Sequence, residues 1–266
     1  MALFQISYPS KVLRREALLS VCLPNVRFKD AAKEVYDWKK KFAVLYLLHG
    51  AGGNHLDWIR YSCVERLADE YQVAVVMPAA DLGFYTDMKY GSPYFTYVAE
   101  ELPRYMEKVF PISDDPRERF AAGLSMGGYG AMKLGLTYPE RFAAVASMSG
   151  VLDVKGLMRE EELAREIELD QVLGWCYGNL AGAKTQENDL CSLLERAAER
   201  RAKLPRLFQC VGTEDFLYEI NQTFLNKAKE LKIDLVYEEE PGIHEWDYWE
   251  KKLPRVFEWM FSERKG

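Results

Sequence analysis

The feature of this sequence that most constrains its fold is the pentapeptide Gly-Leu-Ser-Met-Gly at residues 123–127. It follows an apolar segment of strand length and opens an apolar segment of helical length. A tight turn from a strand into a helix strains its central residue and brings the residues two positions away on either side into contact, so those residues must be small. Gly123 and Gly127 meet this need. We therefore expect Ser125 to stand at the carboxyl end of a sheet, beside the amino end of a helix.

The rest of the chain alternates short apolar runs with amphipathic stretches of helical length. The pattern predicts strands at residues 17–23, 42–48, 72–77, 119–124, 143–148, 206–211 and 234–238. It predicts helices at residues 61–70, 96–109, 126–136, 217–231 and 246–261. Because helices separate the strands and the inner strands are apolar almost throughout, we expect an α/β fold with a mostly parallel central sheet and helices on both faces.

One segment interrupts this alternation. About 55 residues, rich in charge, lie between the strand at 143–148 and the next one at 206–211. Within them, apolar residues recur at helical spacing and predict a helix over residues 189–202. We expect residues 153–203 to form a helical insertion that caps the functional site.

The composition of the 266 residues argues against several classes of function. The 41 acidic and 35 basic residues give a net charge of −6, which disfavours a nucleic-acid partner. The five cysteines are widely spaced without a CxxC pair, and neither a metal-ligand spacing nor a nucleotide fingerprint is present, so we expect no metal and no cofactor. The amino-terminal segment lacks a signal-peptide core and the apolar runs are too short to span a bilayer. These features predict a cytoplasmic protein with no membrane partner.

A serine hydroxyl is inert at neutral pH unless a base takes its proton. The chain has three histidines, His49, His55 and His244. When the nucleophile stands on a strand–turn–helix of this kind, the acid and then the histidine follow the serine in the chain, which excludes His49 and His55. His244 lies on a loop just past the last predicted strand, so we expect it to be the base.

A catalytic histidine needs a carboxylate that fixes its tautomer. Asp215 is the preferred candidate because it lies in the loop directly after the predicted strand at 206–211. Asp153, which follows the preceding strand, and the adjacent Glu214 are the alternatives.

Acyl transfer also requires hydrogen-bond donors where negative charge develops on the carbonyl oxygen. The predicted strand at 42–48 runs into the glycine-rich turn at residues 49–53, His-Gly-Ala-Gly-Gly. We expect the backbone N–H groups of Ala51 and Met126 to form this oxyanion hole. His49 itself is expected to be structural and to hold the turn through a side-chain hydrogen bond.

The sequence resembles the α/β-hydrolases of the esterase D type, in particular the bacterial tributyrin esterases and the related acetyl and feruloyl esterases. The resemblance rests on the segments YLLHGAGGNHLDW, YTDMKYGSPYFTYVAEELPRYMEKVF, AAGLSMGGYGAMKLGLTYPERFAAVASMSG, VGTEDFLYEINQ and GIHEWDYWEKKL. It implies a nucleophile, acid and base at Ser125, Asp215 and His244. It also implies oxyanion donors at Ala51 and Met126.

The resemblance implies one α/β-hydrolase domain over residues 1–266 that hydrolyses short-chain acyl esters through an acyl-enzyme. Tributyrin-like, acetyl and feruloyl esters, including those on carbohydrates, are the expected substrates, and the family leans towards homo-oligomers. The related S-formylglutathione hydrolases have an oxyanion segment like SGLTC, from which residues 49–53 depart. A thioesterase of that kind and a non-catalytic scaffold are the alternatives, and a peptidase would need a peptide-binding site that nothing in the sequence specifies.

Aromatic residues lie within the segments that carry the resemblance, and these segments border the expected site. Trp58, Tyr85, Tyr94, Trp246 and Tyr248 are candidates to line an apolar or sugar-stacking pocket, and packing in the core is the alternative for each.

Overall fold

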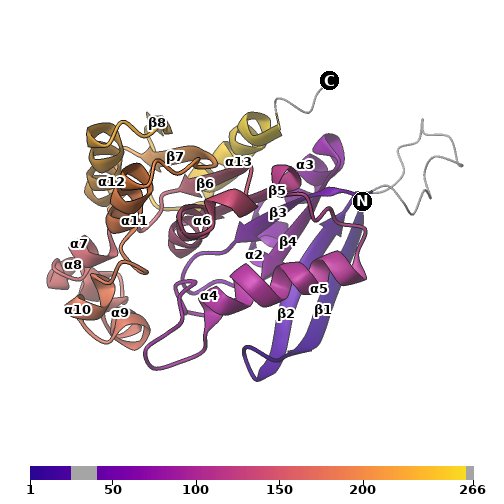
Figure 1. The fold of residues 1–266 in the computed structure, drawn as a ribbon, viewed down its shortest axis with the longest axis horizontal. Coiled ribbons are helices and arrows are strands. Elements are labelled where there is room, and N and C mark those ends of the chain that lie inside the picture. The colour runs from indigo at the N-terminus through magenta and orange to yellow at the C-terminus, as the bar shows by residue number, and fades with distance from the viewer. Residues whose placement is uncertain (25–40, 262–266) are drawn as a thin grey trace, which may run out of the picture.

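The computed structural model describes residues 1–24 and 41–261, and its centre is an eight-stranded sheet (Figure 1). The strands are β1 (Ala2–Ser10), β2 (Arg15–Leu23), β3 (Ala43–Leu48), β4 (Val73–Pro78), β5 (Arg119–Leu124), β6 (Ala144–Met148), β7 (Arg206–Gly212) and β8 (Val236–Glu240). Their order in the sheet is β1-β2-β4-β3-β5-β6-β7-β8. Strand β2 runs antiparallel to both of its neighbours, and the other neighbouring pairs are parallel. The mostly parallel sheet is therefore confirmed.

Helices cover both faces of this sheet. The α-helices of the described residues are α2 (Asp57–Tyr61), α3 (Val64–Tyr71), α4 (Tyr94–Thr96), α5 (Leu102–Val109), α6 (Met126–Thr137), α7 (Val154–Leu157), α8 (Glu161–Glu166), α9 (Asp170–Tyr177), α10 (Leu180–Ala183), α11 (Leu190–Glu199), α12 (Tyr218–Glu230) and α13 (Trp246–Phe261). A π-helical turn, Tyr97–Glu101, joins α4 to α5, and the two short 3₁₀ turns are Pro116–Glu118 and Pro139–Arg141.

Side chains that alternate along the inner strands build one core on each face of the sheet. Val44, Tyr46 and Leu48 of β3 pack in the cluster that includes the buried residues of α5, α6 and α12. Leu45 and Leu47 point the other way, into the cluster formed with α3 and α13. Because both faces are covered, the inner strands are buried at every position, which explains why they read as unbroken apolar runs.

The edge strand β1 was not predicted from the sequence. Leu3, Phe4 and Gln5 are exposed in succession, Leu3 and Phe4 by about two-fifths each, and exposed and covered positions alternate only from Ile6 to Ser10. Figure 1 shows α5 lying across β1 and β2, where Tyr105 stacks on Tyr8 with 3.9 Å between the ring centres. The strand therefore pairs with β2 and packs against α5 without an apolar run of its own.

Residues 153–203 contain the helices α7 to α11. Figure 1 shows α7, α8, α9 and α10 gathered at one end of the molecule, below α11 and α12 and far from β1. The predicted helix at 189–202 corresponds to α11, which begins after the side chain of Asp189 accepts a hydrogen bond from the backbone N–H of Cys191. A capping role for this insertion stays a prediction.

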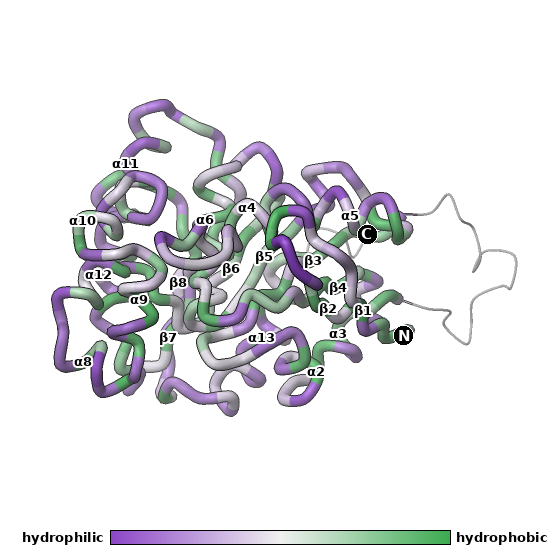
Figure 2. Tube along the Cα trace, turned by 90° about the horizontal axis from the view of Figure 1, so that it is seen from below, coloured by the Kyte–Doolittle hydropathy of each residue, from purple (hydrophilic) through white to green (hydrophobic). Residues whose placement is uncertain are grey.

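The outer helices are amphipathic. Figure 2 shows hydrophilic and hydrophobic stretches alternating along their coils. Among the described residues, no helix combines the length and the apolar character needed to cross a lipid bilayer.

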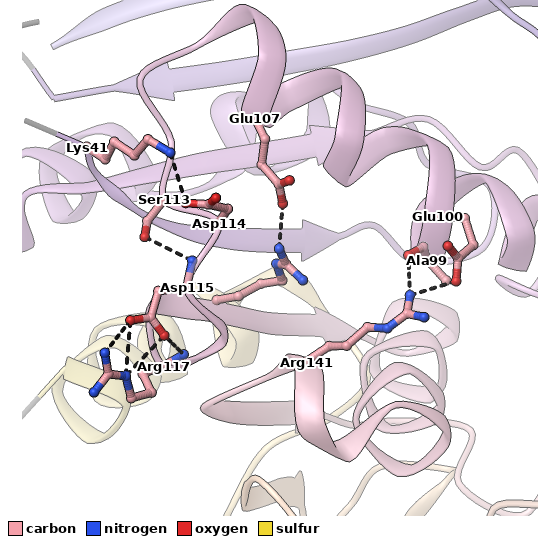
Figure 3. A network of polar contacts seen from close by, with 10 residues as sticks. Lys41, Ala99, Glu100, Glu107, Ser113, Asp114, Asp115, Arg117 and Arg141 are labelled. Carbon is pink, nitrogen blue, oxygen red and sulfur yellow. Dashed lines mark hydrogen bonds and ion pairs between the residues drawn. The ribbon is translucent and has the colours of Figure 1, made fainter. Parts of the chain in front are cut away.

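A polar network anchors the start of β5, at the end opposite Ser125 (Figure 3). The guanidinium of Arg119, the first residue of β5, pairs with Glu107 of α5, and both side chains are less than a quarter exposed. Arg141 donates to Glu100 at 2.6 Å, just before α5 begins. The pair of Arg119 with Glu107 thus joins α5 to the sheet, whereas that of Arg141 with Glu100 joins the turn before β6 to the π-helical turn before α5. Partly buried ion pairs are less screened than exposed ones.

Lys133 of α6 has a buried amino group that links the insertion to the rest of the domain through hydrogen bonds. Its side-chain nitrogen donates to Thr86 Oγ1 at 2.8 Å and to Asn188 Oδ1 at 3.0 Å, and it lies 4.6 Å from the ring centre of Phe95. Asn188 belongs to the insertion. Burial lowers the pKa of Lys133 to about 7 because the ammonium group loses its hydration.

We expect Lys133 to make the stability of the protein depend on pH. An unfolded lysine has a pKa of 10.5, so between about pH 7 and that value the unfolded chain binds more protons than the folded chain. The cost of burying the ammonium group is therefore full below pH 7 and is relieved as the pH rises. The free energy of unfolding of Lys133→Met minus that of the wild type should fall between about pH 6.5 and 9.5 in urea titrations. A constant difference would contradict this account.

Candidate active site

Ser125 occupies the turn between β5 and α6 in a strained conformation. Its φ of 51° and ψ of −119° lie in a region that non-glycine residues rarely adopt, at a typical cost of about 1–3 kcal/mol. A Cβ atom on Gly123 would lie 2.4 Å from the backbone of Gly127, and a Cβ atom on Gly127 would lie 2.4 Å from the carbonyl oxygen of Leu48. Both glycines are therefore required by close backbone contacts, as the sequence predicted.

The segment after β6 holds the backbone of Ser125 in this conformation. The N–H of Ser125 donates to the carbonyl of Met148 at 2.9 Å. The carbonyl of Ser125 accepts a hydrogen bond from the N–H of Val151 at 3.3 Å. Residues 148–151 thus clamp both polar backbone groups of the strained residue.

Three side chains that are far apart in the sequence form a hydrogen-bonded row. His244 Nε2 lies 3.0 Å from Ser125 Oγ, and His244 Nδ1 lies 2.9 Å and 3.0 Å from the two carboxylate oxygens of Asp215. A carboxylate only accepts hydrogen bonds, so it selects the tautomer with the proton on Nδ1. The lone pair on Nε2 then faces the serine hydroxyl. The arrangement is able to remove a proton from Ser125 and return it to a leaving group.

The carboxylate of Asp215 is fully buried. One of its oxygens also accepts a hydrogen bond from the N–H of Leu217 at 2.8 Å, which fixes the rotation of the carboxylate. Since a buried charge needs partners, these bonds to Leu217 and His244 compensate for lost water.

Two aromatic rings flank the imidazole of His244. The ring centre of Phe216 lies 4.4 Å away and that of Trp249 lies 4.9 Å away. The side chain of His244 is 12% exposed, whereas Phe216 is 42% exposed. Phe216 therefore forms an open apolar rim beside the histidine. Sequence reasoning missed both residues because nothing in their spacing distinguishes them from core aromatics.

The two alternative carboxylates have other contacts. Asp153 caps the start of α7, where it accepts a hydrogen bond from the N–H of Gly156 at 3.0 Å. Glu214 accepts a hydrogen bond from the N–H of Gly242 at 2.7 Å and so ties the loop of His244 to that of Asp215. Neither of these contacts is to His244.

The turn after β3 lies close to the turn between β5 and α6 that carries Ser125, which we call the elbow. The N–H of Gly53 donates to the carbonyl of Gly50 at 3.2 Å and Gly52 has a φ of 75°, which is typical of a type II turn with Ala51 at its first central position. A Cβ atom on Gly50 would lie 3.5 Å from the Cβ atom of Ser125. Ala51 is therefore next to the elbow.

Met126 is the first residue of α6, so its N–H group has no acceptor within the helix. Together with the N–H of Ala51 it remains the predicted pair of oxyanion donors.

His49 is a structural residue in this turn. Its Nε2 accepts a hydrogen bond from the N–H of Ala80 at 2.9 Å, so Nδ1 carries the proton and donates to the carbonyl of Gly50 at 2.7 Å. Burial lowers the pKa of His49, which keeps the ring neutral. Tyr85 supports the same turn, because its hydroxyl donates to the carbonyl of His49 at 3.1 Å.

Trp58, Tyr85 and Tyr94, which the sequence nominates either to line a pocket or to pack in the core, are buried, so the structure favours core packing and a pocket role stays a prediction. Each is at most 2% exposed. Their polar atoms bond within the protein, as when the indole N–H of Trp58 donates to the carbonyl of Leu48 at 3.1 Å. Trp246 is half-buried, and its ring packs edge-on against Trp58 with 5.1 Å between centres. Tyr248 is also buried. Their burial depends on tertiary contacts that a sequence pattern does not reveal.

The five cysteines are free thiols, and Cys22, Cys176, Cys191 and Cys210 are buried. Burial raises the pKa of each of these four to about 12, so they remain protonated and unreactive. Within the described part of the chain, no group of three or more His, Cys, Asp or Glu side chains is arranged to hold a metal ion.

Comparisons with known proteins agree with this geometry. The model of a family described as "Putative esterase" matches residues 10–260. An acetyl esterase of Caldicellulosiruptor saccharolyticus is 33% identical over 269 residues, which cover 98% of each chain. Two solved structures from Staphylococcus aureus each cover 98% of this chain and are covered to 98% by it. They are FphF, a fluorophosphonate-binding serine hydrolase (TM-score 0.86, 32% identity), and an S-formylglutathione hydrolase, FrmB (TM-score 0.85, 31% identity). The predicted α/β-hydrolase fold is confirmed.

We expect the elbow to tolerate no side chain at Gly127. The Cβ atom of Gly127→Ala would lie 2.4 Å from the carbonyl oxygen of Leu48 and 2.7 Å from that of His49. Because both are backbone atoms, the free energy of unfolding should fall by roughly 2–3 kcal/mol. Gly174→Ala is the matched control, because Gly174 lies within α9 with no atom within 4 Å of the added carbon, and it should gain about 0.5–1 kcal/mol. Urea titration measures both, and equal midpoints would contradict the requirement.

Proposed function

Since the chain belongs to the esterase family whose model matches residues 10–260 and is a carboxylic ester hydrolase, we propose that it cleaves short-chain acyl esters through an acyl-enzyme on Ser125. The observation that carries this proposal is the hydrogen bond of 3.0 Å between His244 Nε2 and Ser125 Oγ. It joins a strained, nearly buried serine to a base whose other nitrogen is fixed by a buried carboxylate.

In the proposed acylation, Ser125 Oγ attacks the ester carbonyl carbon while His244 Nε2 takes the hydroxyl proton. Asp215 keeps the proton on Nδ1 and stabilises the imidazolium that forms. The tetrahedral intermediate collapses when its bond to the alcohol oxygen breaks and His244 gives its proton to that oxygen. The products of this half-reaction are the free alcohol and an acyl group on Ser125.

Water completes the proposed cycle. His244 removes a proton from a water molecule, whose oxygen attacks the acyl carbon, and the second tetrahedral intermediate returns the proton to Ser125 Oγ as the carboxylic acid leaves. In both halves we assign the negative oxygen to the N–H groups of Ala51 and Met126. The positive end of α6 supports the same charge.

We propose acetyl and butyryl esters as the substrate class. The acetyl esterase relative over the full chain favours a small acyl group. A thioesterase acting on S-formylglutathione is the second candidate, favoured by the likeness to FrmB over the full chain. Both candidates use the same acyl chemistry and differ in the leaving group, so rates on matched esters and thioesters separate them.

The first test replaces the nucleophile. Ser125→Ala should lower kcat/KM for p-nitrophenyl acetate and butyrate by at least about 10³-fold, and it should abolish labelling by a fluorophosphonate probe. Ser192→Ala is the control, since Ser192 lies on α11 and bonds to Asp189. The same assay with S-formylglutathione decides the substrate class, and we expect the esters to be turned over faster. Unchanged turnover in Ser125→Ala would refute the proposal.

The second test separates the carboxylates. Asp215→Asn should lower kcat by about 10⁴-fold, because an amide does not select the tautomer with the proton on Nδ1. Asp153→Asn should leave kcat within about threefold of the wild type, since Asp153 contacts the start of α7 instead. Equal losses in the two variants would contradict the assignment of Asp215.

A further inference from the structure

Asn221 of α12 is a fully buried amide that no step of the proposed reaction uses. Its Nδ2 donates to the carbonyl of Gly150 at 2.9 Å and to the carbonyl of Leu217 at 2.9 Å. These two carbonyls belong to different loops, one after β6 and the other after β7. A single side-chain nitrogen therefore joins two loops that are almost seventy residues apart in the sequence.

The first loop is the one that clamps the nucleophile. Gly150 stands between Met148, which accepts from the N–H of Ser125, and Val151, which donates to the carbonyl of Ser125. A shift of Gly150 would move both partners of the strained serine. The hydrogen bond from Asn221 thus acts on Ser125 through its clamp.

The second loop is the one that carries the acid. Leu217 donates its N–H to Asp215 Oδ1 at 2.8 Å, while its carbonyl accepts hydrogen bonds from both the backbone N–H and the side chain of Asn221. A shift of Leu217 would rotate the carboxylate that orients His244.

A second buried amide holds Asn221 in place. Gln209 of β7 donates from Nε2 to Asn221 Oδ1 at 3.0 Å and to the backbone carbonyl of Asn221 at 2.9 Å. These bonds fix which atom of the Asn221 amide is the nitrogen, because Oδ1 must accept from Gln209. The nitrogen is then directed at the two carbonyls. Gln209 itself makes no contact with either loop in this network.

We propose that Asn221 is a positioning residue that sets the distance between the loop holding Ser125 and the loop carrying Asp215, and this rests on the proposed function. Acyl transfer needs the serine, the imidazole and the carboxylate in register within a fraction of an ångström, and a displacement of about 1 Å costs on the order of 10²-fold in rate. The bond from Asn221 acts on the rate of the chemical step and not on ester binding.

The test compares Asn221→Leu with Gln222→Leu, which replace neighbouring amides of α12. Gln222 is half-buried, and its side-chain nitrogen donates to the hydroxyl of Tyr237 at 2.5 Å. Asn221→Leu should lower kcat for p-nitrophenyl acetate by roughly 10- to 100-fold, change KM by less than about threefold, and slow fluorophosphonate labelling to the same extent as kcat. Gln222→Leu should keep kcat within about threefold of the wild type, because the side chain of Gln222 bonds to Tyr237 and Glu239 of β8.

Asn221→Asp is the second variant, for use if Asn221→Leu does not fold. It keeps the shape of the side chain, but a buried neutral carboxyl offers one O–H donor in place of two N–H donors, so one of the two carbonyl bonds is lost and a smaller loss of kcat is expected. Equal kcat values in the wild type and the Asn221 variants, or equal losses in the Asn221 and Gln222 variants, would overturn the inference. A wild type that neither hydrolyses esters nor reacts with the fluorophosphonate would instead reject the proposed function.

Discussion

The backbone conformation of Ser125 is the constraint on which the rest of the structure depends. A positive φ at a serine is unfavourable, and it persists because Gly123 and Gly127 touch one another and because Met148 and Val151 bond to both polar backbone groups. The first contact requires a strand and a helix packed without side chains between them. The second requires that β6 lie directly beside β5 in the sheet. A local strain in one residue is thus stabilised by the order of the strands.

The same strand order brings the site together. The strands β3, β5, β6, β7 and β8 are consecutive neighbours and run parallel, so their carboxyl ends meet at one edge of the sheet. Each is followed by one part of the candidate site: the glycine-rich turn at residues 49–53, Ser125, residues 148–151, Asp215 and His244. The polar network at the start of β5 fixes the opposite end of the sheet, where no such residues are needed.

The parts of the fold and of the candidate site that were predictable are those that depend on short sequence motifs or on the order of residues in the chain. The elbow at Ser125 and the order of Asp215 and His244 depend on short contiguous motifs and on chain order, so the sequence sufficed to nominate them. The buried strands were predicted from their unbroken apolar runs, whereas β1 was missed because an edge strand with exposed apolar side chains has no such run. For Trp58 and Tyr85 the sequence offered both a pocket and the core, because aromatic residues are common in both, and their burial favours the core. Asn221 was not predicted, since the role proposed for it depends on contacts between segments that are distant in the sequence.

The contrast between His49 and His244 shows why residue type alone does not decide chemistry. Both rings are largely buried, and both nitrogens of each ring have hydrogen-bonding partners. The partners of His49 are a backbone N–H and a backbone carbonyl, which satisfy the neutral ring and would leave an imidazolium uncompensated in a dry environment. Those of His244 are a carboxylate and a hydroxyl, so a proton accepted by this ring would lie beside a charge of opposite sign. The carboxylate of Asp215 is therefore the feature that separates a structural histidine from one able to move a proton.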